Sequence, residues 1–152
     1  MLEYEVVNLQ EKKVVGITAR TNNLSPKMPE IIGGLWNRFY NEGIYASISN
    51  KVNAKSMGTY TDFSSDTKGD YTAGVAVEVS SFDSVPKETE TFRIPAGKYA
   101  KFVVKGNVRT AVSDFWKQVW QENLPMNFQC DFEEYQNEDM ENAIIHIYIS
   151  ID

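Results

Sequence analysis

A carboxylate placed among aromatic side chains is the strongest chemical signal in this sequence. It lies in residues 129–135, which read Gln-Cys-Asp-Phe-Glu-Glu-Tyr, and the chain closes with Ile-Ile-His-Ile-Tyr-Ile-Ser-Ile at residues 144–151. Both stretches are typical of β-strands, in which side chains alternate between two faces. A carboxylate among aromatic rings on one such face predicts a site for a cationic or polar-headed organic molecule.

The alternation predicts which of these side chains share a face. In the last strand four isoleucines occupy one face and Tyr148 occupies the other. In the earlier strand Phe132 and Glu133 point in opposite directions, and Tyr135 shares the face of Glu133. If the two strands are antiparallel neighbours, we expect Phe132 to join the isoleucines in the core. Glu133, Tyr135 and Tyr148 would then lie together on the other face.

The composition excludes several classes of function. With a net charge of −6 and no basic run, the chain is a poor candidate for nucleic-acid binding. The single cysteine, Cys130, excludes an internal disulfide, and with the single histidine, His146, it cannot form a usual zinc site. A Cys130–His146 nucleophilic pair is disfavoured against a buried thiol and a strand histidine. We therefore expect neither a metal nor a cofactor.

The length and hydrophobicity predict one domain over residues 1–152, with 42% hydrophobic residues available for a core. The eight Tyr, eight Phe and three Trp also suit an aromatic-lined cavity. The chain has no run of 18 apolar residues, and its start lacks the apolar core of a signal peptide. A cytoplasmic protein without membrane contact is expected.

Helix and strand patterns place these residues on larger elements. Ser25 and Pro26 predict the start of a helix that ends at Gly43, and a second helix is expected to begin at residues 106–107 and to stop before Pro125. Gly33 and Gly34 inside the first helix would be explained by close packing on a sheet or a ligand. Residues 45–55 are expected to form a loop. Strands are expected at residues 4–9, 13–18, 57–63, 70–79, 91–95 and 99–105, besides the two stretches above.

The two halves of the chain run in the same order of strand, helix, strand, turn and strand. This order predicts an α+β fold of two βαββ units related by a pseudo-two-fold axis, with repeat one over about 1–80 and repeat two over about 91–152. We expect two main helices on one side of antiparallel sheets and a ligand groove between the halves on the other side. The matched segments are 35–40 with 115–120, 57–60 with 132–135, and 75–79 with 147–151.

The repeat separates structural from functional residues. Glu133 corresponds to Gly58 in this alignment, and Tyr148 corresponds to Ala76. The first half therefore builds the same unit without these side chains, which favours a functional role for them. The alternative is that Glu133 is a solvated strand residue.

Three segments in this order resemble the GyrI-like (gyrase-inhibitor-like) family over almost the whole chain: Ile-Pro-Ala-Gly-Lys-Tyr-Ala at residues 94–100, Phe-Glu-Glu-Tyr at 132–135, and Ile-Tyr-Ile-Ser-Ile at 147–151. That family includes the effector-binding domains of bacterial AraC- and MerR-type multidrug regulators such as BmrR. The resemblance implies a small-molecule site in which the acidic residue of the Phe-Glu-x-Tyr motif meets cationic lipophilic drugs. It assigns this role to Glu133 and implies that Tyr148 is the tyrosine of the final strand.

This sequence departs from the family pattern at two places. Ser150 replaces the usual proline of the last strand, and no helix-turn-helix precedes the first expected strand. The resemblance therefore implies an effector-binding protein of transcription-regulator type without its own DNA-binding domain.

Three functions fit these residues. The first is binding of a cationic or lipophilic organic compound, with Glu133 as charge anchor. The second is a hydrolase that opens strained electrophilic rings of natural-product toxins, in which Glu133 acts as general acid or positions water and Tyr135 or Tyr148 assists. The third is a protein-interaction module that inhibits gyrase or contacts a regulator.

Two of the candidate site residues have a structural alternative. Trp36 and Trp116 could instead belong to the core between helix and sheet, and Trp120 is expected in the core. The residues expected to line the ligand site are Glu133, Tyr148, Tyr135, Tyr60, Trp36 and Trp116.

Overall fold

The structure, a computed structural model, describes residues 2–152. It consists of eight strands and three helices. The strands are β1 (Glu5–Leu9), β2 (Lys12–Asn22), β3 (Lys51–Thr61), β4 (Asp70–Val79), β5 (Glu90–Ile94), β6 (Gly97–Gly106), β7 (Met126–Tyr135) and β8 (Ala143–Ile151). The helices are α1 (Met28–Asn41), α2 (Ile44–Ser47) and α3 (Val108–Val119).

All eight strands belong to one curled antiparallel sheet with the order β1-β6-β8-β7-β3-β4-β2-β5. This order is symmetric about the boundary between β7 and β3, because β2, β4 and α1 of the first half correspond to β6, β8 and α3 of the second. The short strands β1 and β5 each pair with the opposite half, β1 with β6 and β5 with β2. The prediction of an α+β fold built from two βαββ units is therefore confirmed.

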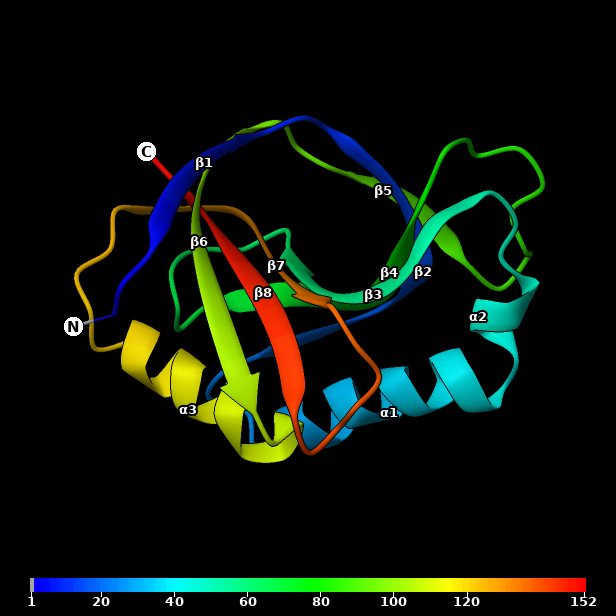
Figure 1. Ribbon diagram of the computed structural model, residues 1–152. Helices are drawn as coiled ribbons and strands as arrows, with labels where there is room; N and C mark the ends of the chain where they lie inside the picture. Colours follow the sequence, from blue (N-terminus) through cyan, green and yellow to red (C-terminus); the bar gives the residue numbers. More distant parts are fainter. Residues whose placement is uncertain (1) are drawn as a thin grey trace.

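The two main helices lie on the same side of the sheet, and β1 and β5 arch over the other side (Figure 1). Each helix packs its apolar face on the strands of its own half, with Leu35 and Phe39 of α1 and Phe115 and Val119 of α3 buried. A third buried cluster fills the inside of the curl and contains residues from both halves but none from the helices. The curled sheet therefore has core on both faces.

The helix boundaries follow the sequence signals with one correction. Asn107 caps α3 as expected, since its side chain accepts a hydrogen bond from the Arg109 N–H. The start predicted with Ser25 as the cap and Pro26 as the first helical residue is wrong by two residues. Ser25 accepts from the Lys27 N–H in a preceding turn, and α1 begins at Met28 with a proline, Pro29, in its first turn. A proline there removes no helical hydrogen bond, so either Pro26 or Pro29 could begin the helix.

Residues 45–55 are not a loop throughout. α2 ends at Ser47, and β3 begins at Lys51, six residues before the predicted start. The pairing of β3 with β4 shifts between Lys51 and Ser56, so this part of the strand lacks a regular partner and a regular apolar pattern. Within residues 2–152, none of the helices is long and apolar enough to cross a membrane.

Candidate functional site

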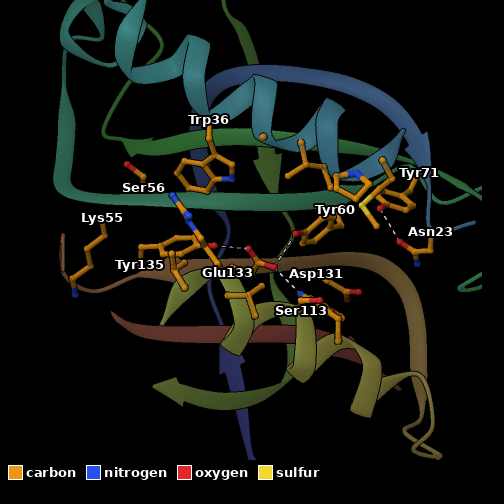
Figure 2. Close-up of a pocket in the computed structure, with 18 of the residues that line it drawn as sticks. Asn23, Trp36, Lys55, Ser56, Tyr60, Tyr71, Ser113, Asp131, Glu133 and Tyr135 are labelled. Carbon is orange, nitrogen blue, oxygen red and sulfur yellow. Dashed lines mark hydrogen bonds between the residues drawn. The ribbon is translucent and has the colours of Figure 1, made fainter. Parts of the chain in front are cut away.

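The centre of the sheet carries a buried carboxylate. Glu133 lies in β7 and pairs across the pseudo-symmetric boundary with Gly58 of β3. Only 2% of Glu133 is exposed. Its side chain is on the face that carries α1 and α3, and it points into a cavity between the two helices (Figure 2).

The predicted assignment of faces is partly wrong. Glu133 and Tyr135 share a face, as expected, but β7 pairs with β8 so that Glu133 is opposite Ile147 and Phe132 is opposite Tyr148. The isoleucines therefore lie on the face of Glu133, where they pack with α3. Phe132 and Tyr148 stack inside the curl, with ring centroids 4.7 Å apart. Tyr148 is thus separated from the cavity by the sheet, and the groove lies on the helix side, not on the side predicted.

Three donors bind the carboxylate of Glu133 (Figure 2). The Tyr60 hydroxyl donates to Oε2 at 2.8 Å, and the Trp116 indole Nε1–H donates to the same oxygen at 2.7 Å. The Tyr135 hydroxyl donates to Oε1 at 3.0 Å. The pseudo-symmetry brings these donors together, because Tyr60 and Tyr135 occupy equivalent places on β3 and β7.

The aromatic rings around Glu133 also form symmetric pairs. Trp36 meets Tyr135 edge to face at 5.0 Å between centroids, and Trp116 meets Tyr60 edge to face at 5.5 Å. Each pair joins a helix of one half to a strand of the other. The two pairs therefore join the halves, and all four rings line the same cavity.

Burial and hydrogen bonding act in opposite directions on Glu133. Burial raises its pKa above the ordinary value, and the hydrogen bonds from Trp116, Tyr60 and Tyr135 lower it. Burial and the neighbouring carboxylate raise the pKa of Tyr60 and of Tyr135, so both hydroxyls keep their protons and act as donors. Among residues 2–152, no lysine, arginine or histidine forms an ion pair with Glu133.

The cavity has a volume of about 1150 Å³, which is large enough for a drug-sized molecule. Its lining is mainly apolar and aromatic, and Lys55, Arg109, Asp66 and Glu138 also contribute. Five of the six predicted ligand-site residues line it, and Tyr148 does not. The five are Glu133, Tyr135, Tyr60, Trp36 and Trp116.

Several lining residues were not predicted. Trp120 is 39% exposed and lines the cavity instead of the core. Phe128 reaches the cavity from a bulge in β7, where its φ is 57° and the pairing with β8 shifts. Tyr71 donates to the Asn23 side chain at the cavity wall. Asp131, two residues before Glu133 and so on the same strand face, is a second buried carboxylate, and strand alternation alone could have indicated it.

Of the two explanations expected for the glycines of α1, close packing on the sheet is wrong and close approach to a ligand stays a prediction. A Cβ atom at Gly33 or Gly34 would meet nothing within 4 Å outside the helix. Close packing on the sheet therefore does not explain them. Gly33 lines the cavity, and the missing side chain leaves room for an occupant.

The chain is similar to several known proteins. The Bacillus subtilis (strain 168) protein YobU, described as a candidate transcriptional regulator, is 29% identical over 153 residues, which cover 96% of each chain. A Vibrio cholerae integron cassette protein, VCH_CASS2, has a TM-score of 0.73 at 24% identity, covering 97% of this chain and 95% of the other. SAV2435, solved with bound tetraphenylphosphonium, has a TM-score of 0.80 at 24% identity, covering 99% and 94%.

The structural matches show that the fold is shared. A model of the family described as Cass2, integron-associated effector binding protein, matches residues 5–151. Because this match spans nearly all of the chain, the protein belongs to the Cass2 family of integron-associated effector binding proteins.

Proposed function

We propose that the cavity binds a lipophilic organic cation, with Glu133 as its charge anchor. The observation that carries this proposal is a carboxylate that is 2% exposed, lies at the floor of a large aromatic cavity and has no cationic side chain as a partner among residues 2–152. Burial disfavours the ionised carboxylate, and a bound cation offsets that free energy. The surrounding rings add cation–π attraction.

The family and the structural relatives support this class of ligand. The family is one of effector-binding proteins, and SAV2435, which shares the fold, was solved with tetraphenylphosphonium. Few directional contacts and a broad aromatic surface favour binding of several cations of similar size. The three phenolic and indole donors hold the carboxylate in place before the ligand arrives, so little reorganisation is required on binding.

The three tryptophans, Trp36, Trp116 and Trp120, all line the cavity, so tryptophan fluorescence reports its occupancy directly. The test is a titration with tetraphenylphosphonium and with its neutral relative triphenylphosphine oxide. We expect saturable quenching by the cation, and a loss of affinity in Glu133→Gln of about 1–3 kcal/mol, the scale of a charge-assisted contact.

Glu134→Gln is the matched control. It removes the same charge from the next residue of β7, whose side chain is on the opposite face and hydrogen-bonds Gln136. It should leave the affinity unchanged. Equal affinities in wild type and Glu133→Gln would contradict the anchor role. Tetraphenylphosphonium has no strained ring to open, so the hydrolase alternative needs a different probe: a strained epoxide recovered with one added water in mass spectrometry would point to a hydrolase.

A further inference from the structure

We propose that Asp131 is a second anchor in the same cavity and that the site accepts organic dications whose two positive centres are spaced like alternate residues of a strand. This inference rests on the proposed function, because it assigns a ligand class to the cavity that contains Glu133. It goes beyond that function by assigning a role to a carboxylate that the binding of a single cation does not use.

Asp131 and Glu133 lie on the same face of β7, with Glu133 between Asp131 and Tyr135 (Figure 2). Alternate residues of a strand are about 7 Å apart. Asp131 is 3% exposed, and like Glu133 it lines the cavity. One cavity therefore presents two carboxylates at a spacing set by the strand.

The hydrogen bonding of Asp131 leaves most of its capacity unused. The Ser150 N–H donates to Oδ1 at 3.2 Å, at the place where the pairing of β7 with β8 shifts. Among residues 2–152, no donor binds Oδ2, in contrast to the three donors on Glu133. An asparagine would accept from Ser150 equally well without placing an ionisable group in the interior. The bulge therefore explains why residue 131 has a hydrogen-bond acceptor for the Ser150 N–H. It does not explain why that acceptor is an ionisable carboxylate.

The electrostatic environment of Asp131 links dication binding to protons. Burial raises the pKa of Asp131 to about 8, the Ser150 N–H lowers it, and the charge of Glu133 raises it. A second positive centre near Asp131 favours the ionised form, so binding of a dication near neutral pH releases a proton. The titratable or charged groups around Asp131 are Glu133 and Cys130 of β7, Tyr60 of β3 and Tyr99 of β6; Lys55, Asp66, Tyr71, Arg109, Tyr135 and Glu138 lie elsewhere on the cavity wall.

The test uses two probes of nearly the same shape. Methyl viologen carries two quaternary nitrogens at opposite ends of a bipyridinium core, and N-methyl-4-phenylpyridinium carries only one. Both are titrated by tryptophan fluorescence into the full chain, as wild type, Asp131→Asn and Glu133→Gln, at pH 6, 7, 8 and 9. Asp131→Asn keeps an acceptor for the Ser150 N–H, and circular dichroism checks its fold.

We expect wild type at pH 8 to prefer methyl viologen by roughly tenfold, the scale of one charge-assisted contact. This preference should increase from pH 6 to pH 8, because less free energy is then needed to ionise Asp131. It should not increase further above pH 8. In Asp131→Asn the preference for methyl viologen over the monocation should fall to about twofold at every pH. This factor remains because either end of the symmetric dication can meet Glu133. The affinity for the monocation should be retained. Glu133→Gln should lower the affinity for both probes.

An equal preference in wild type and Asp131→Asn would overturn the second anchor and leave the first intact, provided that monocation binding still depends on Glu133. If folded wild type binds neither probe, both the first anchor, Glu133, and the second anchor, Asp131, are overturned. If Asp131→Asn does not fold, measurements on wild type alone test the proposal. Calorimetry in two buffers of different ionisation enthalpy shows whether binding of methyl viologen releases a proton. The proposal is overturned if no proton is released and the preference for methyl viologen does not change between pH 6 and pH 9.

Discussion

Gly58 and Glu133 are direct partners across β3 and β7, at the centre of the symmetric strand order. A Cβ atom at Gly58 would lie 2.9 Å from Oε1 of Glu133 and 3.5 Å from Cζ2 of Trp36. Only one half of the repeat can therefore carry a carboxylate at this position, because the other half must leave space for it. The asymmetry of one glutamate and one glycine follows from their contact on the symmetry axis.

Gly58→Ala tests this relationship. Because the atom displaced is the end of a side chain, the fold should persist and the carboxylate should move away from the Tyr135 hydroxyl. We expect the affinity for tetraphenylphosphonium to fall by about 1 kcal/mol, the net value of one hydrogen bond, in a fluorescence titration. An alanine variant with wild-type affinity would show that the carboxylate does not need this space.

The two tyrosines on Glu133 should not be equivalent. The Tyr60 hydroxyl donates to the carboxylate at 2.8 Å and the Tyr135 hydroxyl at 3.0 Å, and the hydrogen bond from Tyr60 lowers the pKa of Glu133 more than the one from Tyr135. Tyr60→Phe should therefore raise the pKa of Glu133 further than Tyr135→Phe does. The readout is the pH at which cation affinity is half maximal, which should be higher in Tyr60→Phe. Equal midpoints in the two variants would contradict this asymmetry.

The buried carboxyls also predict how stability depends on pH. Burial raises the pKa of Asp131 to about 8, so the folded protein binds more protons than the unfolded chain between about pH 4 and pH 8. The free energy of unfolding should therefore fall as pH rises through this window, by at most about 1.4 kcal/mol per pH unit for this group.

Urea unfolding at pH 4 and pH 8 checks this prediction. The stability of Asp131→Asn should be closest to that of wild type at pH 4, where Asp131 is neutral in the folded protein and partly neutral in the unfolded chain, and should exceed it at pH 8. Glu134→Gln serves as the charge-matched control. If the stability of Asp131→Asn depends on pH as steeply as that of wild type, ionisation of Asp131 does not destabilise the folded protein.

Gly34→Ala should stabilise the protein. A Cβ at Gly34 would meet nothing within 4 Å outside the helix, and alanine favours an interior helical position by about 1 kcal/mol over glycine. Thermal or urea unfolding should show an increase of this size, with ligand affinity retained because Gly34 does not line the cavity. A decrease in stability would indicate that α1 needs flexibility at this residue.

The local pattern of the sequence was sufficient for most of the elements and for the repeat, but not for α2 or the start of β3. Strand alternation and helix spacing act between neighbouring residues, so the two βαββ units, the Asn107 cap and the shared face of Glu133 and Tyr135 could all be predicted. The matched segments of the two halves make Gly58 the equivalent of Glu133, whereas the direct pairing of these two residues was not predicted and follows from the pairing of β3 with β7. The ligand roles of Glu133 and its neighbours stay predictions.

Which face receives the helices was decided only by the tertiary structure. Alternation tells which side chains of one strand lie together, but a register shift of one residue between two strands exchanges the faces. β7 and β8 pair Phe132 with Tyr148, and this register moves Tyr148 into the curl and leaves Glu133 with the isoleucines under α3. The donor set of Glu133 likewise depends on α3 carrying the Trp116 indole across to it, a contact between residues 17 positions apart. Such contacts arise from the packing of whole elements, which no short stretch of sequence encodes.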